Sequence, residues 1–126
     1  MNEFDTNLQI MNSIKQQIVA GQLKSGDKLA SVREQAEAFA VNPNTVQRAY
    51  QELEREGVSE TRRGTGSFIT ENANLIPELK GQMARDVILK FIEGMKALGF
   101  TDKQMQKELE RALEQQGAAH TSGGAH

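Results

Sequence analysis

Two short helix signals follow one another within residues 31–57, and only a tight turn separates them. Ser31 and Glu34 have the spacing of a capping box, which predicts a helix that begins at Ser31. Asn42 is a typical N-cap residue and Pro43 a typical first helical residue, so a second helix should begin there. Two helices joined by so short a turn are a candidate helix-turn-helix.

The second of these helices has one apolar and one polar side. Its apolar positions recur at helical spacing and comprise Val46, Ala49, Tyr50 and Leu53. The polar positions carry amide, hydroxyl and guanidinium groups, and they are Asn44, Thr45, Gln47, Arg48 and Gln51. Such groups read base edges or bind phosphates in DNA complexes. The pattern predicts a recognition helix, and the alternative interpretation is an ordinary solvated helix surface.

The flanking segments complete a winged arrangement. A first helix is expected from about Leu8 to Ala20, because apolar residues recur there at helical spacing. Residues 58–70 predict a β-hairpin with a basic, glycine-containing tip, formed by Arg62, Arg63 and Gly64. Glycine allows the backbone to approach the minor groove closely, and arginine suits its negative potential.

The last third of the sequence predicts two more helices, joined as an antiparallel hairpin. One should run from Pro77 to about Leu98, and the other from a capping box at Thr101 and Gln104 to about Gln116. A pair of helices cannot bury all of this apolar surface by itself, so we expect it to dimerise. The expected dimerisation residues are Ala84, Ile88, Phe91, Ile92, Met95, Leu98, Met105 and Leu109.

Composition excludes several classes of function. There is no cysteine, and the only histidines are His120 and His126 in a tail rich in small residues, so neither a metal site, a cofactor nor a catalytic pair is expected. The longest apolar runs are far shorter than the roughly 20 residues of a membrane-spanning helix. We therefore expect a cytoplasmic protein that is not an enzyme.

The charge balance is unusual for a DNA-binding chain. The net charge is −2, from 15 basic and 17 acidic residues, and neither half of the chain is basic. Strong binders of nucleic acid usually carry a basic patch. If this chain binds DNA, a few well-placed cations must do it.

Three separated motifs resemble the GntR family of bacterial transcription regulators. They are residues 21–33 (Gly-Gln-Leu-Lys-Ser-Gly-Asp-Lys-Leu-Ala-Ser-Val-Arg), residues 41–57 (Val-Asn-Pro-Asn-Thr-Val-Gln-Arg-Ala-Tyr-Gln-Glu-Leu-Glu-Arg-Glu-Gly) and residues 63–68 (Arg-Gly-Thr-Gly-Ser-Phe). The chain departs from the family pattern at Ala30, where proline is frequent, and at Gln35, where leucine is frequent. The short region after the wing resembles the small YtrA-like subfamily.

The resemblance implies a mainly α fold with a small β-hairpin. A winged helix-turn-helix DNA-binding domain would span residues 1–71, a dimerising helical hairpin residues 72–116, and a disordered tail residues 117–126. It also implies a DNA contact for Arg33, and a homodimer that binds a pseudo-palindromic operator, most often as a repressor. A small effector of unknown identity stays open. The alternative is a helical protein-interaction module on a winged-helix scaffold.

Overall fold

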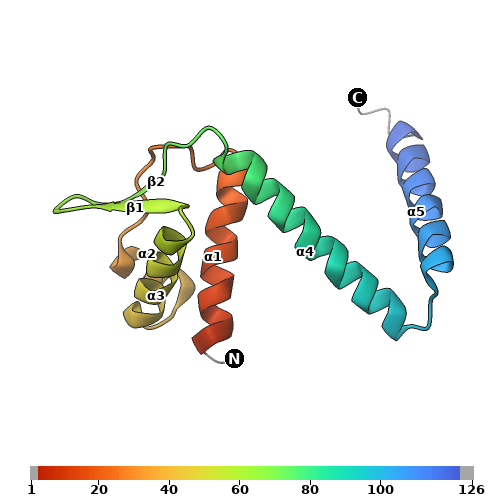
Figure 1. Cartoon of the computed structure of the whole chain (residues 1–126), viewed down its shortest axis with the longest axis horizontal. Coiled ribbons are helices and arrows are strands. Elements are labelled where there is room, and N and C mark those ends of the chain that lie inside the picture. Colours follow the sequence, from red (N-terminus) through yellow and green to blue (C-terminus); the bar gives the residue numbers. More distant parts are fainter. Residues whose placement is uncertain (1–2, 123–126) are drawn as a thin grey trace. The chain divides into compact units, whose positions relative to one another are not determined.

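The computed structural model describes residues 3–122, and it is mainly helical with one antiparallel β-hairpin (Figure 1). The elements in chain order are α1 (Glu3–Val19), α2 (Val32–Phe39), α3 (Pro43–Arg55), β1 (Ser59–Arg62), β2 (Gly66–Ile69), α4 (Leu75–Ala97) and α5 (Asp102–Ser122). The expected fold class is confirmed. The chain divides into two compact units, and the division falls after Gly81, inside α4.

Side-chain caps begin both helices of the helix-turn-helix, as expected. The Ser31 hydroxyl accepts a 3.1 Å hydrogen bond from the Glu34 backbone N–H, and the Glu34 carboxylate accepts a 2.9 Å bond from the Ser31 N–H. The Asn42 side chain accepts a 2.8 Å bond from the Asn44 N–H and caps α3. In the turn between them, Ala40 is left-handed, with φ of 55°. A Cβ disfavours this conformation by about 1–2 kcal/mol. Interactions with the surrounding residues must therefore hold Ala40 in it.

The core of the first unit lies between α1 and α3. Ile10, Ile14 and Ile18 form one face of α1 and are at most 1% exposed. They belong to one apolar cluster with the buried stripe of α3. Leu8, where the sequence predicted the start of this helix, is 42% exposed, and α1 begins earlier, at Glu3.

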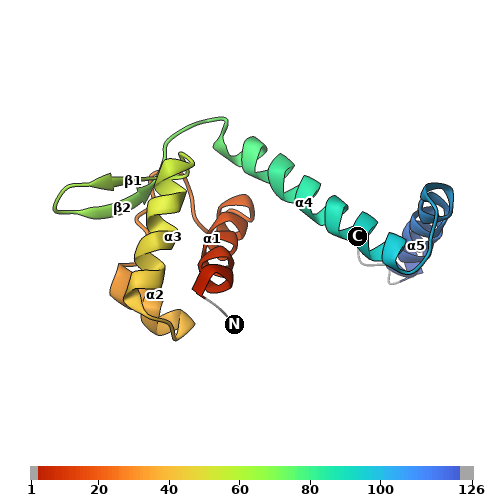
Figure 2. The ribbon, with the colours of Figure 1, turned by 60° about the horizontal axis from the view of Figure 1, so that its bottom comes forward.

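Figures 1 and 2 both show α1, α2 and α3 gathered together, with the hairpin projecting from them. In the hairpin, Ser59 pairs with Ile69 and Arg62 with Gly66. The loop between α1 and α2 forms an isolated antiparallel bridge with β2, between Lys28 and Phe68. This pairing ties the hairpin to a loop that lies about 40 residues earlier in the sequence.

The second unit consists of the rest of α4 together with α5. The capping box that begins α5 is confirmed, since Thr101 and Gln104 exchange hydrogen bonds of 2.9 and 3.2 Å. α4 begins at Leu75, two residues before Pro77, because the first turn of a helix tolerates proline. α5 continues past Gln116, its expected end, to Ser122. Of the tail expected to be disordered, residues 123–126 lie outside the described residues.

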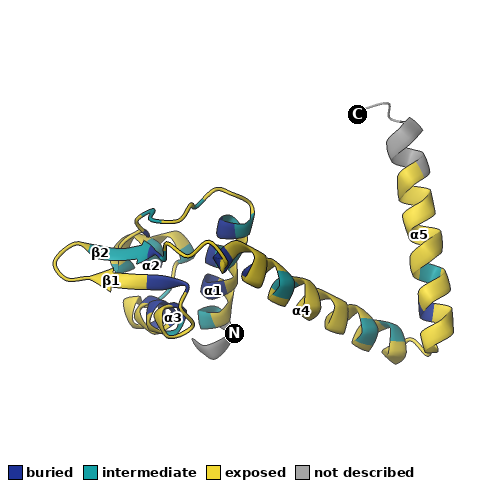
Figure 3. Ribbon diagram, turned by 45° about the horizontal axis from the view of Figure 1, so that its top comes forward, coloured by how far each residue is buried: buried dark blue, intermediate teal, exposed yellow. Residues whose placement is uncertain are grey.

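Most of α4 and α5 is exposed, whereas the buried residues concentrate in the first unit (Figure 3). In the described part of the chain, neither of these helices nor any other has a stretch apolar and long enough to span a bilayer.

Candidate nucleic-acid interface

α3 has an apolar side, which is buried in the core, and an opposite side, which is polar and exposed. Val46, Ala49 and Leu53 are fully buried in the core of the first unit. The opposite side leaves Asn44, Gln47 and Arg48 exposed, together with Gln51. Of these, Asn44, Gln47 and Arg48 are side chains that the sequence assigned to DNA contacts.

Thr45 does not share this exposed face. The residue is only 4% exposed and lies beside the buried Val46. The sequence placed it outward because its hydroxyl fits base contacts, but Thr45 lies four residues before Ala49 and eight before Leu53, so helical periodicity puts it on their buried side. Its side chain is therefore part of the packing of α3 in this structure.

Tyr50 connects α3 to the beginning of α2. Its hydroxyl donates a 2.6 Å hydrogen bond to the carbonyl oxygen of Ala30, which directly precedes the Ser31 cap. Burial raises the pKa of Tyr50 to about 12, and the nearby Glu34 carboxylate adds to the shift. The bond fixes the start of α2, whose first turn presents the exposed Arg33.

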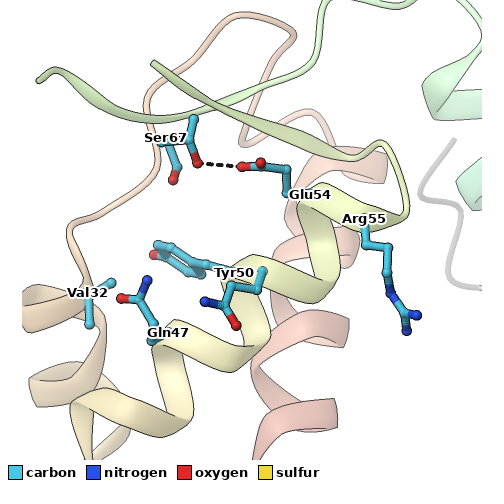
Figure 4. A pocket seen from close by; sticks show the side chains of 8 residues that line it. Val32, Gln47, Tyr50, Glu54, Arg55 and Ser67 are labelled. Carbon is cyan, nitrogen blue, oxygen red and sulfur yellow. Dashed lines mark hydrogen bonds between the residues drawn. The ribbon is translucent and has the colours of Figure 1, made fainter. Parts of the chain in front are cut away.

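A groove of about 590 Å³ lies between α3 and the hairpin (Figure 4). Its lining residues are Val32, Gln47, Tyr50, Gln51, Glu54, Arg55, Thr61 and Ser67. The dashed line in Figure 4 is the hydrogen bond that the Thr61 hydroxyl donates to the Glu54 carboxylate. Sequence reasoning missed this link between helix and wing, because only the turn at Gly57 brings the two residues together.

The residues expected at the hairpin tip are exposed, but Arg62 and Arg63 have different surroundings. Arg63 and Gly64 are exposed in the turn, where Gly64 has φ of 75°. The Arg62 guanidinium lies 4.1 Å from the centre of the Phe68 ring and 3.9 Å from the Glu60 carboxylate. Arg62 is therefore directed back along the hairpin, whereas Arg63 stays at the tip.

The residues expected to dimerise lie in the second unit and differ in exposure. Ile88, Leu98 and Leu109 are 54%, 74% and 45% exposed, and Ala84 and Phe91 are exposed as well. Ile92 and Met95 are half-buried.

Met105, at 6% exposed, is instead covered within its own unit. It lies in an apolar hollow of about 400 Å³ between α4 and α5, with Ile88, Phe91, Ile92, Lys96, Asp102, Gln106 and Leu109. No pattern in the sequence separates this position from the exposed ones.

The described residues contain no cluster of histidine, cysteine, aspartate or glutamate side chains that could hold a metal ion.

The family model described as "Bacterial regulatory proteins, gntR family" matches residues 6–69. The Bacillus subtilis HTH-type transcriptional regulator YhcF is 47% identical over 108 residues, which cover 82% of this chain and 89% of that protein. The HTH-type transcriptional repressor YtrA of Bacillus subtilis is 55% identical over 65 residues, 52% of this chain and 50% of that protein.

A solved structure agrees with these matches. A GntR family transcriptional regulator from Listeria monocytogenes is 39% identical and covers 83% of this chain and 92% of its own, with a TM-score of 0.73. These relatives are regulators of transcription and not enzymes. This chain therefore belongs to the GntR family, as a winged helix-turn-helix regulator of transcription.

Proposed function

We propose that the protein is a repressor that binds a pseudo-palindromic operator as a homodimer. The observation that carries the proposal is the exposed polar face of α3, together with the exposed Arg33 in the first turn of α2 and the exposed hairpin tip. The first turn of a recognition helix is the part that usually enters the major groove. The repressor name of the related YtrA supports the sign of regulation.

Each exposed side chain has a role in this proposal. Asn44 and Gln47 would read base edges, since amides pair with adenine through two hydrogen bonds. Arg48 would contact a base or phosphate at the same turn, and Arg33 a phosphate. At the hairpin tip, Arg63 and Gly64 would enter the minor groove, together with Arg62 if its guanidinium leaves Phe68. Thr45 would act through packing only.

The proposed division of labour follows the two units. The winged domain would cover residues 1–71, completed by Leu75 and Leu79 of α4, which are buried in its core. The helical region of residues 72–116 would dimerise through its exposed apolar side chains. Two copies would then present two recognition helices about 34 Å apart, one DNA turn, or a multiple of it.

Dimerisation also answers the problem of charge. A protomer with net charge −2 has no general attraction to DNA, so placed cations must supply it. Two protomers double the number of phosphate contacts. With six to ten contacts, affinity would fall about 10³- to 10⁵-fold between 50 and 200 mM salt. Such a regulator would act in the cytoplasm, where bacterial DNA lies, without a membrane partner.

Selection of bound duplexes from random DNA by the purified full chain, at two salt concentrations, tests the proposal. We expect an enriched pseudo-palindrome and steep salt dependence. The triple variant Arg33→Ala, Arg48→Ala, Arg63→Ala should lose DNA binding while its circular dichroism spectrum is unchanged. Arg111→Ala, on α5, is the control for loss of one exposed arginine and should bind normally.

The outcomes separate the proposal from its alternative. If no site is enriched and the triple variant binds residual DNA like the wild type, specific readout fails. The helical protein-interaction module would then be the better description. Transcription from a promoter that carries the selected site, measured with and without protein, decides between repression and activation.

A further inference from the structure

Lys28 lies beside the wing, although it belongs to the loop between α1 and α2. Its backbone pairs with Phe68 of β2, and the neighbouring Leu29 N–H donates a 2.8 Å hydrogen bond to the Ser67 carbonyl oxygen. Its side chain extends past Gly66, since a Cβ built on that glycine would lie 3.0 Å from Lys28 Cε and 3.8 Å from Nζ. Gly66 is two residues nearer the hairpin tip than Phe68, so the ammonium group is directed towards the tip.

Arg62 is directed the opposite way. It pairs with Gly66 across the hairpin, but its guanidinium stacks over Phe68 and lies near Glu60, both further from the tip. Paired residues of antiparallel strands share a face, so Lys28 and Arg62 lie on one face, on either side of β2. Lys28, which lies outside the hairpin, thus reaches towards the hairpin tip, whereas Arg62 of the hairpin is directed away from it.

The charge of Lys28 is available to a ligand. The residue is exposed, and within residues 3–122 no carboxylate forms an ion pair with it. Glu34 attracts it from a distance, but that carboxylate already accepts the Ser31 N–H in the capping box. Gly66 has no side chain, so nothing at that position would separate the Lys28 ammonium group from a DNA strand that lies along the hairpin tip.

We infer that Lys28 is a phosphate-binding residue of the wing, which contacts the sugar–phosphate backbone beside the groove that the hairpin tip enters. The inference rests on the proposed DNA binding. Phosphate is the favoured partner because an ammonium is a compact point charge, without the planar fork with which arginine reads guanine. The wing would then hold two DNA-directed cations, Arg63 at its tip and Lys28 from the preceding loop.

The test measures the affinity of full-length Lys28→Gln for its selected operator and for a random duplex, over a series of salt concentrations. A lost phosphate contact weakens both complexes about threefold to tenfold and lowers the slope of log affinity against log salt by about one per protomer. Lys28→Arg should restore both values. Lys24→Gln removes an equal charge from the same loop and should have a smaller effect.

The outcomes are distinct from those of the proposed function. If the wild type binds no DNA, the proposed function fails. If it binds and Lys28→Gln equals it or equals Lys24→Gln, the inference alone is overturned. Loss on the operator without loss on random DNA would make Lys28 a base reader and overturn the assignment to phosphate. A lower melting temperature that Lys28→Arg does not restore would show a structural role and overturn it as well.

Discussion

The hydroxyl of Tyr50 donates a 2.6 Å hydrogen bond to the carbonyl oxygen of Ala30, 20 residues earlier in the chain. The bond joins the recognition helix α3 to the residue that precedes the cap of α2. It therefore fixes the angle at which the first turn of α2, with Arg33, meets the polar face of α3.

Replacing Tyr50 by phenylalanine should lower the free energy of unfolding by about 1 kcal/mol, the usual contribution of such a hydrogen bond. The ring stays in the core, so no cavity forms. Urea denaturation followed by circular dichroism measures the change. A variant as stable as the wild type would show that water replaces the hydroxyl at no cost.

The same residue predicts a loss of stability at high pH. The pKa of Tyr50 is about 12 in the folded chain, above the ordinary value of 10.0. Below pH 10 the hydroxyl is protonated in both states, and the stabilisation is complete. Between pH 10 and 12 only the unfolded state ionises, so the free energy of unfolding falls by up to about 1.4 kcal/mol per pH unit.

This titration is directly visible. Tyr50 is the only tyrosine and there is no tryptophan, so the ultraviolet absorbance of tyrosinate reports this residue alone. The difference in stability between the wild type and Tyr50→Phe, about 1 kcal/mol below pH 10, should vanish and then change sign as the pH rises towards 12. A midpoint near 10 in the folded protein would contradict the prediction.

Replacing Gln47 by alanine should relax the operator preference at one base pair. A two-bond contact between glutamine and adenine discriminates against other bases by about 1–3 kcal/mol. Selection from random duplexes should therefore lose one conserved position in each half-site, with little change in the salt slope. Gln16→Ala, an exposed glutamine on α1, is the matched control. Equal operator preference in both variants would remove Gln47 from the readout.

Replacing Ile88 by glutamate should dissociate the proposed dimer. Ile88 lines the apolar hollow between α4 and α5 and is 54% exposed, so a charge there would be buried in an interface on this face. Leu89→Glu is the control, because Leu89 is 57% exposed but lies about 100° further around the helix. Sedimentation equilibrium gives the mass of each variant. Dissociation by Leu89→Glu alone would place the interface on the other face.

The sequence by itself determined which helices form and where α2, α3 and α5 begin, whereas α1 and α4 begin earlier than it predicted. Ser31 with Glu34 and Thr101 with Gln104 were predicted as caps, and both pairs exchange their two bonds. These interactions join residues three positions apart, so local sequence contains all of the information. The buried stripe of α3 and the hairpin followed for the same reason, since periodicity is a local property.

Only the tertiary structure decided which side chains are available to DNA. Arg62 is directed onto the ring of Phe68, which lies on the facing strand of the hairpin. Lys28 reaches the wing through a strand pairing with residues about 40 positions later. Local sequence fixes which helices and strands form, because their hydrogen bonds and caps lie within a few residues. It does not fix the direction of an exposed charge, because that depends on the surface that a distant segment brings beside it.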